Sequence, residues 1–138
     1  MRAFQTEDIG KLVLRLTLGI LLIMHGVAKI LGGVGGISGM LQNIGLPGFL
    51  AYGVYIGEVL APLLVILGLY ARIGALIVVV HMLAALYLAH LDDLFLLGQG
   101  GGWKLELQGF FLFTALAIAL IGPGRFSVVF FSLRYAFR

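Results

Sequence analysis

Long apolar stretches, separated by short breaks of glycine and charged residues, dominate the hydrophobic pattern of this chain. Four of them reach or approach the roughly 20 mostly apolar residues that a membrane-spanning helix needs. Glycine and proline mark the breaks between them, as at Pro47, Gly68 and the Gly122-Pro123-Gly124 stop. The pattern predicts an all-α, integral membrane four-helix up-down bundle that forms a single domain over residues 1–138. The four predicted spans cover residues 9–31, 49–69, 73–90 and 104–121.

The breaks between these stretches differ in length and composition. Residues 32–48 are uncharged and rich in glycine, and they predict a loop because glycine permits backbone conformations that end a helix. Residues 68–72 form a turn so short that the second and third helices must be antiparallel neighbours. Residues 91–103 form the longest polar break. The apolar tail, residues 125–138, predicts a segment lying on the membrane interface; the alternative is an extension packed against the bundle.

The composition supports a membrane protein and excludes several kinds of chemistry. The chain has 62% hydrophobic and 11% charged residues, whereas a soluble domain averages about 25% charged residues. The lipid bilayer is therefore the first partner that we expect. The absence of cysteine excludes a thiol–disulfide relay, a thiolate metal site and a cysteine nucleophile within the chain. With three histidines and six acids, we expect no metal or haem site, so any redox function depends on a bound molecule or a partner.

The basic residues fall mostly on one predicted side of the membrane. Seven lie on the side of the two chain ends, and only Lys29 and Lys104 lie on the other. This positive-inside distribution predicts a multi-pass membrane protein with both termini cytoplasmic. Membrane placement also explains the net charge of +3, so we expect no nucleic acid as a partner. The seven residues are Arg2, Lys11, Arg15, Arg72, Arg125, Arg134 and Arg138.

Ionisable side chains also lie at depths where lipid is expected. At about 1.5 Å per residue, Glu58 lies about 13 Å below the outer face and His81 about 12 Å above the inner face. His25 lies about 9 Å below the outer face and shares a helix face with Lys29. A charge at the membrane centre costs about 2.5–3.5 kcal/mol on insertion scales. Because the Glu58 side chain is too short to reach the headgroups, we expect it to pair with a base of the first helix or with a bound ligand.

Most of the other polar residues also have a purely structural interpretation. Arg15, Lys29 and Arg72 have side chains long enough to reach the headgroups, and we favour this interpretation for them. For Glu106 we favour a structural role as the acid at the start of the fourth helix, where the helix dipole stabilises a negative charge. His81 is equally compatible with a hydrogen-bonded core histidine and with a ligand contact. Aromatic residues typical of the membrane interface are Trp103, Tyr52, Tyr55 and Tyr70.

Small residues and a proline surround Glu58 in the predicted bundle. Gly53 and Gly57 in the second helix, together with Ala84 in the third, allow helix backbones to approach closely. Pro62, four residues after Glu58, frees the Glu58 carbonyl from its helical hydrogen bond and predicts a kink there. A kink beside a buried carboxylate predicts the floor of a pocket. We therefore expect a buried polar site between helices in the outer half of the bundle.

Six elements, taken together and in order, form a specific pattern: Arg15, His25-Gly26-x-x-Lys29, Gly45-x-Pro47, Glu58, Gly68-x-x-x-Arg72 and Gly122-Pro123-Gly124-Arg125. This pattern resembles the DoxX family of small bacterial and archaeal membrane proteins, over about residues 9–128. The resemblance implies a four-helix inner-membrane protein. Some relatives are described as subunits of thiosulfate:quinone oxidoreductase or quinol oxidase systems, and others as membrane partners in thiol-redox defence.

The resemblance and the buried polar groups lead to three functional hypotheses. The first is a quinone- or quinol-interacting subunit of an oxidoreductase system, with quinone as its cofactor and with Glu58 and His25 as catalytic proton donors. The second is a non-enzymatic scaffold that recruits a redox partner protein, because the chain has no redox group of its own. The third is a small proton-coupled carrier, which would require a homo-oligomer. The expected quinone-binding residues are Lys29, His81, Glu106, Trp103 and Tyr55, and the expected charge network is Arg15, Arg72 and Arg125.

Overall fold

A computed structural model describes residues 6–130 of the chain. Over this range the protein is all-helical and contains no strand, apart from one isolated bridge between Leu97 and Trp103. The described elements are α1 (Thr6–Gly32), α2 (Gly35–Asn43), η1 (Gly48–Tyr52), α3 (Gly53–Tyr55), η2 (Ile56–Leu60), α4 (Ala61–Leu67), α5 (Ala71–Ala89), η3 (Leu91–Asp93) and α6 (Glu106–Ile121).

Three helical stretches of the described chain are long and apolar enough to cross a membrane. They are α1, the continuous stretch Gly48–Leu67 that runs from η1 to α4, and α5. α6 is also apolar but has only 16 residues. Large hydrophobic side chains on these helices face outward, including Val80 of α5 and Phe113 of α6. Outward-facing apolar surface of this kind is what a lipid environment requires, in agreement with the composition.

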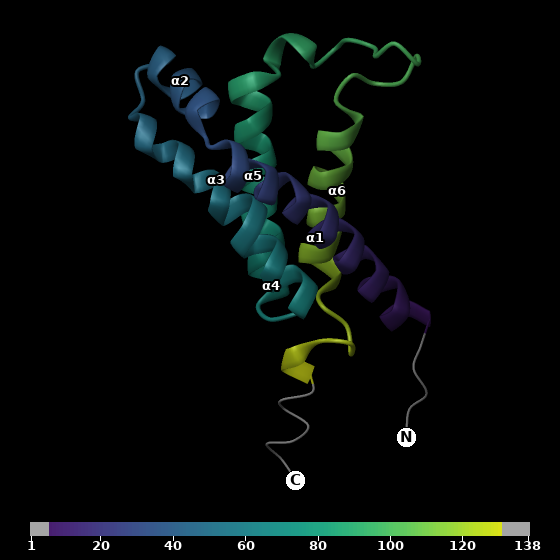
Figure 1. Ribbon diagram of the computed structural model, residues 1–138. Helices are drawn as coiled ribbons and strands as arrows, with labels where there is room; N and C mark the ends of the chain where they lie inside the picture. Colours follow the sequence, from purple (N-terminus) through teal and green to yellow (C-terminus); the bar gives the residue numbers. More distant parts are fainter. Residues whose placement is uncertain (1–5, 131–138) are drawn as a thin grey trace.

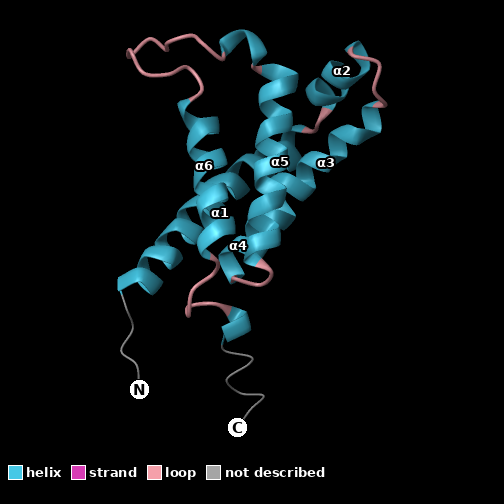
Figure 2. Cartoon of the chain, turned by 180° about the vertical axis from the view of Figure 1, so that it is seen from behind, coloured by secondary structure: helices cyan, strands magenta, loops and turns pink. Residues whose placement is uncertain are grey.

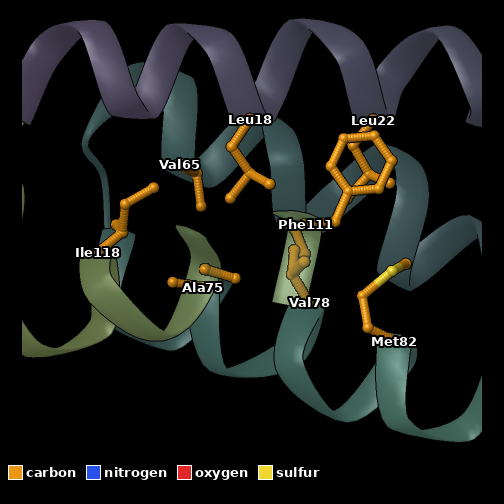
Figure 3. Packing of buried hydrophobic residues seen from close by; sticks show 10 residues of the cluster. Leu18, Leu22, Val65, Ala75, Val78, Met82, Phe111 and Ile118 are labelled. Carbon is orange, nitrogen blue, oxygen red and sulfur yellow. The ribbon is translucent and has the colours of Figure 1, made fainter. Parts of the chain in front are cut away.

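The long helices pack around one apolar core. α1 runs obliquely across the others and contacts α4, η2 and α6, while α5 packs between α4 and α6 (Figures 1 and 2). Leu18 and Leu22 of α1 project toward Val65 of α4, Val78 of α5 and Phe111 of α6 (Figure 3). Because each helix contributes to this cluster, the packing fixes which face of each helix points inward.

The two ends of the helices differ in character. One end, which we call the basic end, holds the turn between α4 and α5 and the segment after α6, where Arg72 and Arg125 lie. The opposite end, which we call the loop end, holds α2, η3 and the connection from η3 to α6 (Figures 1 and 2). Lys29 and Lys104 are the lysines toward the loop end. The residues of the predicted interfacial tail beyond residue 130, with Arg134 and Arg138, lie outside the described residues.

The predicted loop over residues 32–48 is wrong in part, because it contains the helix α2. Glycine disfavours a helix by roughly 0.5–1 kcal/mol per residue, which is why the sequence predicted a loop. Tertiary packing outweighs this cost: Leu41 of α2 is buried with Ala51 and Val54 of the second helical stretch, and Leu88 of α5 packs against them. α2 therefore forms as a short cover over the loop end.

Candidate functional site

The segment that carries Glu58 has an irregular helical geometry. Pro62 lacks an N–H and cannot bond the carbonyl of Glu58, and residues Ile56–Leu60 form the π-helical element η2. Such wide turns occur frequently at functional sites. Gly26 of α1 packs directly against this carbonyl: a Cβ added at Gly26 would lie 2.5 Å from the Glu58 oxygen. The missing side chain therefore lets α1 approach η2 at the level of Glu58.

Glu58 lies at the centre of a polar cluster inside the apolar helices. The residue is only 5% exposed, and the Lys29 ammonium donates to both of its carboxylate oxygens at 2.5 Å. His81 Nε2 lies 2.9 Å from Glu58 Oε1, and the Tyr55 hydroxyl donates to the Lys29 backbone carbonyl at 3.1 Å. Of the two partners expected for Glu58, a base of the first helix or a bound ligand, the structure shows the base, Lys29. The acid and the base compensate each other's charge, which is the condition for burying either of them.

A pocket of about 700 Å³ opens beside this cluster, and Lys29, Glu58 and His81 form part of its wall. Its other walls come from α2, from residues 50–58 and from α5, and they are almost entirely apolar. An apolar pocket with a few convergent polar groups is the usual form of a small-molecule site. The polar site expected between helices is thus present, on the α5 side of the second helical stretch.

The small residues near Glu58 have two different roles. Gly57 faces the His81 ring, and a Cβ at Gly57 would collide with it. This contact agrees with the expected close approach of two helices. A Cβ at Gly53, in contrast, would meet no atom within 4 Å, because Gly53 lines the pocket together with Ala84. The expectation that Gly53 mediates helix packing is therefore wrong: Gly53, which has no side chain, and Ala84, whose side chain is small, leave space for the pocket.

Three residues predicted for the site lie away from it. His25 packs its ring edge-on against Phe111 of α6, with the ring centroids 5.6 Å apart, and His81 takes the place beside Glu58 that we expected for His25. Residues four positions apart share a helix face but still differ in direction by about 40°. The long Lys29 side chain therefore reaches Glu58, and the shorter side chain of His25 does not. Glu106 is exposed at the start of α6, and Trp103 lies in the preceding connection. The functional roles predicted for these residues remain predictions.

Two of the three arginines predicted to form a charge network have defined partners at the basic end. Arg15 is 1% exposed and does not extend to the headgroups, contrary to the favoured interpretation. Its guanidinium donates to four backbone carbonyls, two at the end of α4 and two after α6, at 2.6–2.7 Å. Arg125 pairs with Asp8 of α1 at 3.5 Å. Arg72 is exposed beside Gly122. These contacts tie α1, α4 and the segment after α6 together.

A second polar cluster at the loop end was missed by the sequence analysis. Lys104 donates to Asp93 at 2.6 Å, and His90, which lines the pocket, lies 3.6 Å from the other oxygen of Asp93. The neighbouring ammonium lowers the pKa of the Asp93 carboxyl, and the His90 ring adds to this effect. Eleven residues separate Asp93 from Lys104, so no spacing rule pointed to this pair. Within residues 6–130, no group of three or more histidines and acids is placed to hold a metal ion.

The comparisons with known proteins match the part of the chain that carries the Glu58 cluster. The sequence model of DoxX matches residues 10–91, which include most of α1, α2, the whole Glu58 segment and α5. The chain belongs to the DoxX family. A DoxX relative in sequence is the Bacillus subtilis (strain 168) protein named "Putative oxidoreductase CatD", which is 31% identical over 115 residues, or 83% of this chain and 81% of the relative. No solved structure gives a significant match to this DoxX protein.

Proposed function

We propose that this DoxX-family membrane protein is a quinone- or quinol-interacting subunit of an oxidoreductase system. The observation that carries the proposal is the Lys29–Glu58–His81 cluster, which forms a polar wall in an otherwise apolar pocket. The name of the Bacillus subtilis relative, an oxidoreductase, points to the same class of chemistry. The chain has no cysteine, so the electrons of such a reaction must be carried by a bound molecule or by a partner.

The residues present fit a quinone. A quinone has carbonyl oxygens that accept hydrogen bonds and a ring and tail that are apolar, and when bound it supplies a carrier for two electrons. Lys29 is placed to donate a hydrogen bond in the pocket, and the apolar walls suit the ring and the tail. Glu58 and His81 share a hydrogen bond of 2.9 Å, along which a proton can move between the carboxylate and the imidazole. The polar groups are thus suited to bind and orient the quinone and to hold a proton.

Equilibrium binding of decylubiquinone to the purified protein in lipid nanodiscs tests the proposal. We expect saturable binding that Glu58→Gln weakens about tenfold, equivalent to about 1.4 kcal/mol. Glu7→Gln, at an exposed acid of the basic end and outside the pocket, is the matched control and should bind as the original protein does. Thermal unfolding of each variant separates a loss of binding from a loss of folding. His81→Gln, which keeps a hydrogen-bonding side chain, provides a second variant if Glu58→Gln does not fold. Absence of saturable binding to the original protein would refute the proposal.

We also propose an up-down four-helix arrangement in the cell inner membrane, with the basic end on the cytoplasmic side. The support is the gathering of Arg15, Arg72 and Arg125 at one end of the helices, as the positive-inside rule requires. Because the chain has no cysteine, single cysteines report topology without background. Gly100→Cys at the loop end should react with an impermeant maleimide in intact spheroplasts, and Glu7→Cys should react only after permeabilisation. The opposite pattern would reverse the orientation.

A second candidate function is that of a scaffold for a redox partner protein. The observation that favours it is an apolar hairpin at the loop end, formed by residues 94–104, in which Phe95 is 92% exposed. The backbone N–H of Lys104 donates a hydrogen bond to the Leu96 carbonyl, and the indole N–H of Trp103 donates one to the Leu94 carbonyl. These two bonds stabilise the hairpin. A photoreactive residue in place of Phe95 should crosslink the same polypeptide in repeated preparations from the native membrane. Such a result together with no quinone binding would favour the scaffold.

A further inference from the structure

The pocket beside Glu58 is long, and its two halves differ. On α5 its lining residues run from Ile73 to Ala89, a distance of about 24 Å along the helix axis, and His90 follows the end of the helix. On the second helical stretch they run only from Leu50 to Glu58. The half toward the loop end therefore lies between two walls and is covered by α2. The half toward the basic end is walled by α5 and opens to the side, where lipid would lie.

The residues that line the two halves also differ in size. In the loop half, small residues face the space from both walls, with Gly53 on one side and Ala84 and Ala85 on the other. No atom lies within 4 Å of a Cβ built at Gly53, which shows that the space there is open. In the basic half, the residues of α5 are bulky and branched, as at Leu76 and Ile77. A flat ring fits between small residues, whereas a flexible chain fits against branched side chains.

Polarity distinguishes the halves as well. The charged cluster around Glu58 lies where they meet, and His90 lies at the far end of the loop half. The α5 residues that line the basic half, between Ile73 and Val80, are all apolar. A molecule with a polar head and an apolar tail is therefore complementary to the pocket in one direction only. The reverse orientation would press the tail against His90 and Lys29 and leave the head without polar partners.

We propose that the pocket holds a lipid-tailed quinone with its head in the loop half and its tail leaving along α5 toward the basic end. This inference rests on the proposed quinone function and adds the class of ligand, its orientation and its route of entry. The ligand enters sideways from the membrane, through the open half, tail last. A tail-less quinone fills only the loop half, and the tail contacts Ile73, Leu76, Ile77 and Val80.

Photocrosslinking in nanodiscs tests the orientation directly. The probe is a ubiquinone analogue that carries a diazirine at the end of a ten-carbon tail, and crosslinked residues are identified by mass spectrometry. We expect labelling of residues 73–80 of α5, which excess decylubiquinone suppresses. Labelling of residues 34–41 or 84–90 would show the reverse orientation and overturn the inference. Equal labelling of the outward-facing Phe110 and Phe113 of α6 would show that the tail lies in bulk lipid, which would also overturn it.

A pair of variants separates this inference from the proposed function. Leu76→Trp fills the tail half, and Leu83→Trp places the same side chain on α5 away from the pocket; the two leucines are 51% and 52% exposed. We expect Leu76→Trp to reduce crosslinking of the tailed probe about tenfold. The same variant should leave binding of the tail-less 2,3-dimethoxy-5-methylbenzoquinone unchanged. Leu83→Trp should change neither the crosslinking nor the binding. Equal crosslinking in the two variants contradicts the tail route alone. If neither quinone binds the original protein, the proposed function itself fails.

Discussion

The contact between Gly26 and the Glu58 carbonyl makes a quantitative prediction about how α1 is seated. A Cβ added by Gly26→Ala would lie 2.5 Å from the Glu58 oxygen and 2.7 Å from a methyl group of Val59. Ordinary contact begins at 3.4 Å, so the helices must separate by about 0.9 Å. The obstructing oxygen belongs to the backbone and has no rotamer to adopt. Overpacking of this kind costs about 1–3 kcal/mol.

Gly10→Ala is the matched control on the same helix. A Cβ at Gly10 meets no atom within 4 Å, so the substitution only removes the flexibility of glycine and stabilises α1 by roughly 0.5–1 kcal/mol. Gly26→Ala has the same stabilising effect on the α1 backbone, but it is also destabilised by the overpacking against Glu58. The two variants should therefore differ by about 1–3 kcal/mol in their free energy of unfolding, with Gly26→Ala the less stable.

Thermal unfolding in one detergent, followed by circular dichroism, measures this difference. For a chain of this length, about 1 kcal/mol corresponds to roughly 3–5 °C, so we expect the Tm of Gly26→Ala to lie about 3–15 °C below that of Gly10→Ala. The affinity of Gly26→Ala for the quinone should fall as well, because a shift of α1 moves Lys29 away from Glu58. If the two variants have the same Tm, then α1 does not rest on the Glu58 carbonyl and the site geometry is incorrect.

Three further predictions follow from the contacts of the site and of the two ends. Arg15→Met leaves buried carbonyls without their charged donor, which costs about 1–3 kcal/mol for each carbonyl. It should therefore lower the Tm more than Arg15→Lys, which keeps one charged group that can donate. Equal Tm values in the two variants would contradict a contact with several carbonyls. Gly57→Ala should displace the adjacent imidazole from Glu58 and weaken quinone binding, whereas Gly10→Ala, away from the pocket, should not. The two affinities, measured side by side, decide. Because the pKa of Asp93 is lowered, the Asp93 ion pair stabilises the loop-end hairpin at neutral pH and is lost only as the pH falls through that lowered pKa. The fluorescence of the single tryptophan should report this acid transition, and Asp93→Asn should abolish it while Asp92→Asn leaves it; an unchanged transition in Asp93→Asn would assign it to another group.

The role of Glu58 follows from both depth and packing. Its position in the second apolar stretch required a partner, since a carboxylate at that depth is costly without one. The choice of Lys29 and His81 as partners depends on how α1 and α5 are rotated about their axes. That rotation is set by Leu18, Leu22 and the other core residues, whose contacts join distant parts of the chain. The sequence could therefore predict that a pair exists but not which histidine takes part.

The elements that the sequence located well are those whose signal is local. Apolar length places α1, the Gly48–Leu67 stretch and α5 to within a few residues, and the break after Gly122 ends α6 as predicted. Pro62 indicated the irregular backbone at Glu58, because a missing N–H acts on its own helix. In contrast, α2 looked like a loop, since its stability comes from Leu41 packing onto other helices rather than from helix propensity.

The sequence by itself determined that the chain belongs in lipid, where its long apolar helices lie, and that Glu58 needs a partner there. These properties depend on the composition of single segments. Only the tertiary structure decided that Arg15 is buried among backbone carbonyls, that His81 rather than His25 adjoins Glu58, and that the pocket runs along α5. Each of these depends on the crossing and rotation of helices against one another. Close packing of side chains far apart in the sequence sets those angles, and no local pattern encodes them.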